Sequence, residues 1–148
     1  MPQSLAQILI HLVFSTKNRE PLLTTEKLAP TISYLAGTLN AIGCPAIAVG
    51  GGSDHVHLLF ALKRTLSVSD AVEEIKKGSS KWAKAAIHPN FYRQKGYGAF
   101  SVSPSNLEQA KSYIENQETH HQTVSFQDEY RAFLRKHGLE WDERFVWD

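Results

Sequence analysis

The feature that most constrains the fold is a pair of short apolar runs joined by a glycine-rich turn. Residues 44–49 and 54–60 are the two runs, and residues 50–53 between them read GGGS. A glycine turn between two apolar, β-branched runs is typical of a β-hairpin. The second run reads DHVHLLF, which places His55 and His57 two positions apart. We therefore expect a hairpin whose second strand carries two histidines.

These two histidines define a chemical face of the strand. Side chains alternate between the two faces of a strand, so His55 and His57 project from the same side, about 6 to 7 Å apart. Two such imidazoles can share a divalent cation. Val56 and Leu58 point to the opposite face, where helices can cover them. Histidine pairs also occur in strands as half-exposed residues bonded to neighbouring backbone, so the pair needs partners elsewhere before it indicates a metal site.

Composition indicates one soluble domain over residues 1–148. Hydrophobic residues make up 42% of the chain and charged residues 21%, values typical of a globular protein. The single cysteine, Cys44, excludes an internal disulfide and a cysteine-rich zinc site. No run approaches the roughly 20 apolar residues that span a bilayer, and the first residues lack the features of a signal peptide. We expect a cytoplasmic protein.

Charge is distributed unevenly along the chain. The net charge of +1 is short of that of a dedicated duplex-coating protein. Residues 63–95, however, hold eight basic and three acidic side chains, a balance of +5, whereas residues 115–148 hold four basic and eight acidic, a balance of −4. The basic segment can supply a face for phosphates, although a solvated helix surface is the commoner explanation of lysine-rich stretches.

Hydrophobic periodicity predicts an alternation of strands and helices. The expected elements are a strand over 7–14, a helix from Leu28 that ends at Gly43, the hairpin, a helix after Ser67, a strand over 96–103, a helix from Pro104 through at least Gln117, and a short helix after Ser125. The order β-α-β-β-α-β with added helices is that of an α+β ferredoxin-like (RRM-like) sandwich, in which an antiparallel sheet carries helices on one face. The first and third strands would be central, with the histidine face open or covered by the added C-terminal helix.

Local signals refine this scheme. Pro30 indicates that the first helix starts late or has a kinked first turn. Three pairs have the spacing of N-terminal caps: Ser67 with Asp70, Ser105 with Glu108, and Ser125 with Asp128. His11, in the middle of the first strand, is expected to pack or bond locally rather than to bind metal. The two tryptophans of the tail are expected to pack back onto the body.

The helix after Pro104 carries a second candidate pair. Tyr113 and Gln117 are four residues apart, so they lie about 40° apart around the helix axis, at the edge of its apolar stripe. Their side chains would face the same part of the protein or the same ligand. Taken alone, such a tyrosine can equally be a core residue and such a glutamine a hydrogen-bonding residue at the rim.

Together these motifs carry a family resemblance. DHVHLLF, QKGYGAFSVS and SYIENQETHH resemble the single-tyrosine transposases of the HUH nuclease superfamily, those of the smallest bacterial insertion sequences and their relatives associated with repetitive extragenic palindromes. The resemblance covers nearly the whole chain, including the tail FQDEYRAFLRKHGLEWDERFVWD. One departure is Arg93 before Gln94, where relatives often carry tryptophan.

The resemblance implies a function and roles for the candidate residues. His55 and His57 match the metal-binding HUH pair, Tyr113 the nucleophile and Gln117 the third metal ligand. The family binds Mg²⁺ or Mn²⁺, cleaves single-stranded DNA beside an imperfect hairpin, and keeps the 5′ phosphate as a phosphotyrosine while releasing a 3′ hydroxyl. Relatives work as homodimers in which the tyrosine helix of one subunit completes the site of the other.

The residue types suit this chemistry. A neutral His/His/Gln set leaves the charge of the cation undiminished, and a tyrosine ester divides strand transfer into two displacements. The tyrosine must lose its proton, and the sequence fixes no general base. His120 and His121 follow Tyr113 by seven and eight positions, with undefined roles.

Two other functions remain open from the sequence. One is a binding module for nucleic-acid hairpins that cuts nothing, for which Tyr97 and Phe100 would be the aromatic residues on the sheet. The other is a replication initiator or relaxase with the same chemistry, although the chain has no helicase or primase region. For DNA, the candidate phosphate contacts are Lys76, Lys77, Lys81, Lys84, Arg93 and Lys95.

Overall fold

The computed structural model describes residues 2–117 and 123–148. The strands are β1 (Leu9–Ser15), β2 (Ala46–Gly51), β3 (His55–Ala61) and β4 (Gly98–Val102). The helices are α1 (Thr25–Ala41), α2 (Val68–Ala86), α3 (Leu107–Glu115) and α5 (Phe126–Lys136), with short 3₁₀ turns η1 (Lys17–Arg19) and η2 (Pro104–Asn106). His120 and His121 lie outside the described residues, so their roles stay undefined.

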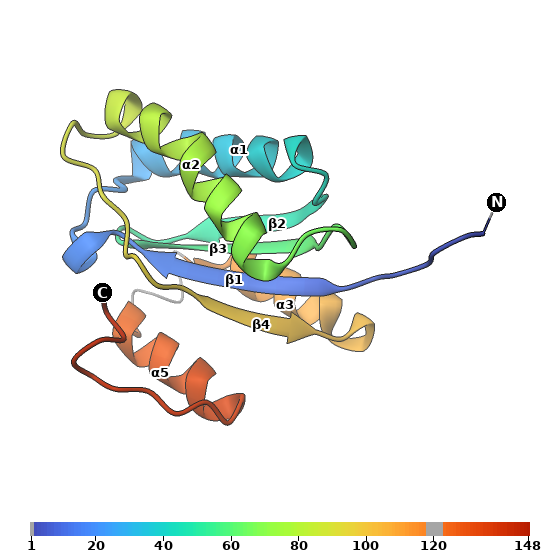
Figure 1. Cartoon of the computed structure of the whole chain (residues 1–148). Coiled ribbons are helices and arrows are strands. Elements are labelled where there is room, and N and C mark those ends of the chain that lie inside the picture. The colour runs from blue at the N-terminus through green and yellow to red at the C-terminus, as the bar shows by residue number, and fades with distance from the viewer. Residues whose placement is uncertain (1, 118–122) are drawn as a thin grey trace.

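The four strands form one antiparallel sheet in the order β2-β3-β1-β4. The predicted β-α-β-β-α-β order is confirmed, and the first and third strands are central as expected. Figure 1 shows α1 and α2 on one face of the sheet and α3 and α5 on the other. The prediction of helices on one face therefore holds for α1 and α2, while the histidine face is covered by α3 in addition to the C-terminal helix.

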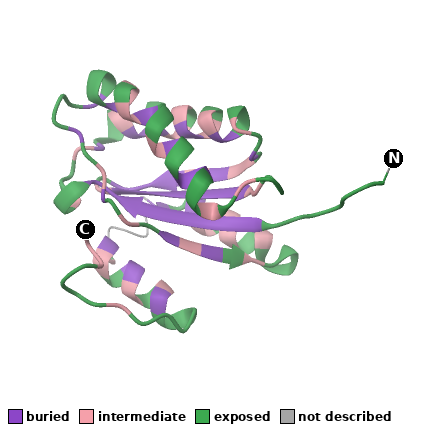
Figure 2. Cartoon of the chain, in the orientation of Figure 1, coloured by how far each residue is buried: buried purple, intermediate pink, exposed green. Residues whose placement is uncertain are grey.

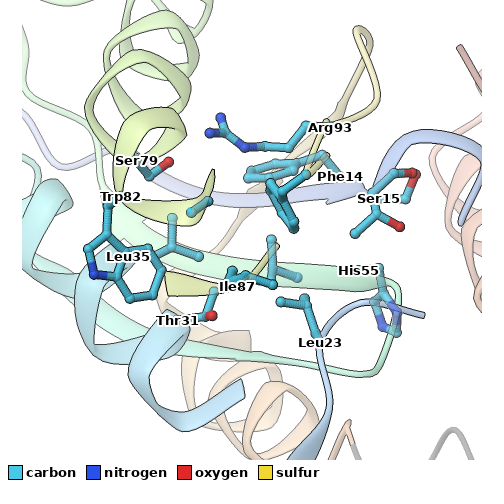
Figure 3. Close-up of a pocket in the computed structure, with 14 residues that line it drawn as sticks. Phe14, Ser15, Leu23, Thr31, Leu35, His55, Ser79, Trp82, Ile87 and Arg93 are labelled. Carbon is cyan, nitrogen blue, oxygen red and sulfur yellow. The ribbon is translucent and has the colours of Figure 1, made fainter. Parts of the chain in front are cut away.

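The face beneath α1 and α2 is structural. Val56, Leu58 and Phe60 of β3 pack with Leu35, Leu39 and Ile75 of the two helices in the largest hydrophobic cluster. Every residue of β1 is buried, as is every residue of β3 except Ala61 at its end (Figure 2). The cavity left between these layers, bordered by Phe14, Leu35 and Trp82, has a volume of about 20 Å³ (Figure 3). That is room for about one water molecule, so this cavity is too small for a larger ligand.

Two glycines allow α3 and α5 to approach the opposite face closely. A Cβ atom on Gly50 of β2 would lie 2.2 Å from the carbonyl oxygen of Ile114 in α3. A Cβ on Gly98 of β4 would lie 2.6 Å from the ring of Tyr130 in α5. Because real Cβ contacts under 3.0 Å essentially never occur, only glycine permits this packing.

Two helix starts differ from the predictions. α1 begins at Thr25, five residues before Pro30, so the expected late start is wrong. Ser105 and Glu108 form no capping box, because Ser105 lies in η2 and α3 starts after Asn106, whose side chain makes no capping bond.

The other two predicted caps are confirmed. Ser67 accepts a hydrogen bond from the Asp70 backbone N–H at the start of α2, and Ser125 accepts one from the Asp128 N–H at the start of α5. These bonds satisfy backbone donors that a helix start leaves unpaired.

The tail returns to the body as predicted. Trp141 and Trp147 pack against the cluster that α5 forms with Phe100. The tail is also bonded to the segment before β4, since Gln94 Nε2 donates to the Val146 carbonyl at 2.9 Å. Among the described residues, no helix is both long and apolar enough to cross a bilayer.

Candidate active site

The two histidines of β3 form the floor of the candidate site. His55 and His57 are 1% and 0% exposed, and their ring centroids lie 5.1 Å apart on the face covered by α3 and α5. β3 is hydrogen-bonded to a strand on each side, which fixes its backbone. The predicted placement of both imidazoles on one face of a central strand is confirmed.

α3 and the residues that follow it bring Gln117 onto His55. The Gln117 Oε1 lies 3.1 Å from His55 Nε2. Its Nε2 donates to the Tyr113 carbonyl at 3.3 Å, so the amide nitrogen is engaged and the oxygen is directed to the histidine. α3 itself ends at Glu115, short of the predicted boundary, yet this bond keeps Tyr113 and Gln117 on one side as the four-residue spacing indicated.

His57 lies between two side chains from other elements. Its Nδ1 is 2.7 Å from Nε2 of His11 on β1, and its Nε2 is 2.8 Å from Oε1 of Glu129 on α5. His11 bonds to its neighbour on the adjacent strand, in agreement with the prediction. Burial, with a smaller contribution from His57, lowers the pKa of His11 to about 3, so His11 is neutral near pH 7.

Tyr113 reaches the same point from α3. Its hydroxyl donates a hydrogen bond to Glu129 Oε2, and its ring centroid lies 6.0 Å from that of His57. Burial and the contact with Glu129 raise the pKa of Tyr113 above its ordinary value, because both disfavour the phenolate. One carboxylate thus joins the candidate nucleophile to the candidate metal ligands, all within a single chain.

Sequence reasoning did not single out Glu129. It is 3% exposed, and a glutamate in an amphipathic surface helix is ordinarily a solvated residue. A signal was nevertheless present, since Glu129 lies three positions after Phe126 and four before Phe133, on the apolar side of α5. An acid in phase with aromatic residues indicates a partner in the interior.

The donor set fits a divalent cation. Ligand atoms of His55, His57 and Glu129 all lie within 4.8 Å of one another. The Asp54 carboxylate lies 2.8 Å from His55 Nδ1 and can only accept, which leaves Nε2 as the ring nitrogen for a cation. His55 Nε2 lies 3.1 Å from the Gln117 oxygen and 3.7 Å from Glu129 Oε1. Convergent electron-pair donors are the arrangement that a cation satisfies, and oxygen ligands beside imidazole suit Mn²⁺ or Mg²⁺.

A cleft opens beside this cluster. It has a volume of about 620 Å³ and lies between α3, α5 and β4. Tyr113 and Glu129 line it together with Asn106, Phe133 and His137. The nucleophile candidate is therefore reachable from a polar and aromatic groove of the size typical of ligand pockets.

The six candidate DNA-binding residues fall into two groups. Lys76 donates to the carbonyls of Gln94, Lys95 and Gly96, and Arg93 donates to the Lys76 carbonyl and to Ser80 Oγ. Burial lowers the pKa of Lys76 to about 8, with a smaller contribution from Arg93, and it lowers that of Arg93 to about 10. The remaining candidates are exposed: Lys77, Lys81, Lys84 and Lys95.

These basic residues are linked to the site around one end of the sheet. α2 covers the face opposite to the histidines (Figure 1), but the segment between α2 and β4 passes the end of β1. There Arg93 forms a bridge with Thr16, and the Thr16 N–H donates to the Asp54 carbonyl at 2.8 Å. Asp54 directly precedes His55, so the basic segment and the histidines share this end of the sheet.

Comparisons with known proteins agree with the geometry. A family model described as "Transposase IS200 like" matches residues 4–117, a span that includes His55, His57, Tyr113 and Gln117 and ends before α5. A 1.90 Å crystal structure of a proposed transposase from Deinococcus radiodurans R1 is similar with a TM-score of 0.63 and 25% identity, over 80% of this chain and 96% of that one.

A second solved structure supports the fold alone. It is a REP-associated tyrosine transposase bound to a REP hairpin, with a TM-score of 0.58 and 16% identity over 84% of this chain and 74% of that one. No curated protein matches the chain. Because the family model spans well over half of the sequence, from β1 through α3 to Gln117, this chain belongs to the IS200-like transposase family.

Proposed function

We propose that this transposase is a metal-dependent single-stranded DNA endonuclease and strand transferase of the HUH type, which acts beside DNA hairpins through a 5′-phosphotyrosine at Tyr113. The observation that carries the proposal is the convergence of the Tyr113 hydroxyl, the His55 and His57 imidazoles and the Gln117 amide in one buried cluster.

His55, His57 and Gln117 are the proposed ligands of Mg²⁺ or Mn²⁺, and Glu129 adds a carboxylate donor. A bound cation polarises the scissile phosphate and offsets charge in the transition state. Glu129 also reduces the net charge of the loaded site relative to a purely neutral ligand set. α3 and α5 cover the site, and the cleft between them borders Tyr113 and Glu129, so we propose that DNA enters from the cleft.

Tyr113 is the proposed nucleophile. Its oxygen forms a bond to phosphorus and the bond to the 3′ oxygen breaks. The departing 3′ oxygen takes up a proton from water and is released as a hydroxyl, while the 5′ phosphate stays on the enzyme. The phenol must give up its proton in this step. The Glu129 carboxylate already accepts the hydrogen bond of that hydroxyl, so it is the group placed to take the proton.

The basic residues suggest a path for the DNA. The exposed lysines of α2 are proposed phosphate contacts for the hairpin, a ligand class that the REP-associated relative binds. The single strand would then pass Arg93 and Lys95 around the end of the sheet, where Thr16 connects this segment to Asp54. Lys76, bonded to three carbonyls, would hold the segment in place.

A homodimer stays a prediction from the family. In the single chain the tyrosine already meets its own histidines, so we propose that each site is completed in cis. Sedimentation at micromolar concentration tests the dimer separately from the chemistry.

Covalent adduct formation tests the proposed function. The protein is incubated with Mn²⁺ and end-labelled single strands from both flanks of its gene, and the products are resolved on a denaturing gel. We expect a protein-linked band for the wild type and none for Tyr113→Phe. Tyr34→Phe is a matched control, because the Tyr34 hydroxyl donates to the Gly78 carbonyl at 2.9 Å on the other face of the sheet.

Other outcomes would identify a different function. Tight hairpin binding with no adduct from either flank would indicate a non-cleaving hairpin-binding module. An adduct that persists in Tyr113→Phe would move the nucleophile to another residue. Nicking at a plasmid origin, without transfer at palindromes flanking the gene, would favour an HUH replication initiator or relaxase.

A further inference from the structure

Each of the two proposed metal-binding histidines has its second ring nitrogen held by another side chain. His55 Nδ1 lies 2.8 Å from Asp54 Oδ1, and His57 Nδ1 lies 2.7 Å from His11 Nε2. Both rings therefore turn Nδ1 away from the cluster and Nε2 toward it. The two partners differ in chemistry, since one is a carboxylate and the other an imidazole.

The position of the ring proton decides whether a histidine can bind a cation. Neutral imidazole has one N–H and one lone pair, and only the nitrogen with the lone pair is a ligand. A hydrogen-bond acceptor on the other nitrogen fixes the proton there and orients the ring. A carboxylate such as Asp54 can only accept, and the imidazole of His11 can accept through Nε2.

We propose that His11 and Asp54 are positioning residues that, when a cation is bound, support the tautomers of His57 and His55 with the proton on Nδ1, so that both Nε2 atoms are ligands. The inference rests on the proposed function, because it concerns the cation that His55 and His57 would hold. Neither positioning residue needs to touch the metal or the DNA.

The placement of His11 supports this role. His11 pairs with Leu59 across the β1–β3 ladder, two residues from His57, which is a diagonal distance that long side chains bridge. The imidazole is held on its other sides, with ring centroids 5.1 Å from Phe133 and 6.3 Å from Phe100, and His11 is 4% exposed. It lies on a central strand, so its Nε2 has little freedom to leave His57.

His11 and Glu129 contact His57 at opposite ring nitrogens. Without a cation, the Glu129 carboxylate can only accept, so His57 donates from Nε2 to Glu129 and its Nδ1 accepts from His11. A cation held between His57 and Glu129 would take the place of the Nε2 proton, and His57 Nδ1 would then donate to His11 Nε2. A purely structural core position on a central strand would ordinarily hold an apolar side chain, as Ile10 and Leu12 do on either side. The buried polar ring is therefore explained by its contact with His57.

The test measures Mn²⁺ affinity by titration calorimetry. His11→Phe keeps a ring but removes the acceptor, and we expect the dissociation constant to rise about 10- to 100-fold. His11→Gln places an amide near the position of Nε2 and should recover most of the affinity. His88→Phe is the matched control, since His88 is exposed just after the end of α2 and its Nδ1 accepts a local bond from the Asn90 N–H at 3.0 Å. Asp54→Ala should weaken binding more than Asp54→Asn.

A wild-type measurement keeps the inference testable if His11→Phe does not fold. In ¹⁵N NMR spectra of the Mg²⁺-loaded wild type, we expect the proton of His57 on Nδ1. His11→Phe or Asp54→Ala binding Mn²⁺ as tightly as wild type would overturn the inference while leaving the proposed function intact. A proton on Nε2 of His57 in the loaded wild type would count against both, because His57 would then not be a ligand. Absence of Mn²⁺ binding by the wild type would overturn both.

Discussion

Replacing Gly50 by alanine should displace α3 slightly from the sheet. The added Cβ would lie 2.2 Å from the Ile114 carbonyl oxygen and 3.1 Å from the Ile114 Cγ2. The first of these neighbours is backbone, so it cannot move aside by changing a rotamer. α3 must shift by about 1 Å to restore an ordinary contact, since overpacking is relieved by backbone displacement.

The expected cost has two parts. Inserting a methyl group into a packed interior destabilises a protein by about 1 to 3 kcal/mol. In addition, α3 carries Tyr113 and orients Gln117, and a displacement of about 1 Å at a catalytic group can reduce the rate about 100-fold. We expect Gly50→Ala to lower the free energy of unfolding in urea and to slow DNA cleavage far more than the lost stability explains.

Gly37→Ala is the matched control. Gly37 lies within α1, and a Cβ there would meet nothing within 4 Å. Alanine at such a position should stabilise the protein by about 0.4 to 1 kcal/mol, because it restricts the unfolded chain. Gly50→Ala with wild-type stability and rate, or equal losses in both variants, would refute the packing argument.

Three further results follow from particular contacts. Glu129→Gln should weaken Mn²⁺ binding and slow adduct formation, measured by calorimetry and single-turnover gels, because the carboxylate lies against His57. Folding lowers the pKa of Lys76 from 10.5 to about 8, so the unfolded chain binds more protons between these two pH values. The free energy of unfolding of wild type, measured in urea, should therefore increase relative to that of Lys76→Met as pH rises from 8 to 10.5. Neutralising the exposed Lys77, Lys81 and Lys84 should weaken hairpin binding and reduce the magnitude of the negative slope of log K against log salt by about two to three. Unchanged binding would make these three lysines ordinary surface residues.

Much of the fold is encoded in local patterns. The HVHLLF alternation and the glycine turn before it define a strand with one histidine face and one apolar face. The apolar face packs beneath α1 and α2 as predicted, and both histidines lie on the other face. Helical spacing placed Tyr113 and Gln117 on one side of their helix. These signals are local, since they depend on backbone periodicity that each segment carries in its own sequence.

The closure of the site depends on information that no segment carries alone. Glu129 is ordinary within its helix and becomes part of the cluster only because Gly98 allows α5 to pack on β4. Likewise, Lys76 and Arg93 read as surface cations, but the carbonyls of a distant segment take up their donors. Such contacts depend on how closely two elements pack against each other, and the periodicity of one element does not predict that distance.

The location of Tyr113 and the histidines in one chain leads to a decisive mixing experiment. Tyr113→Phe lacks the nucleophile and His57→Ala lacks a proposed ligand, so each variant alone should be inactive. If subunits exchanged their tyrosine helices, each mixed dimer would have one intact composite site. About a quarter of all sites would then be intact in a fully mixed population. The bond from Tyr113 to Glu129, beside His57 of the same chain, predicts that the mixture stays inactive. Adduct formation in the mixture would show that α3 leaves this position in the active enzyme and that the sites are composite. The adduct should then increase when the two variants are unfolded and refolded together before the assay.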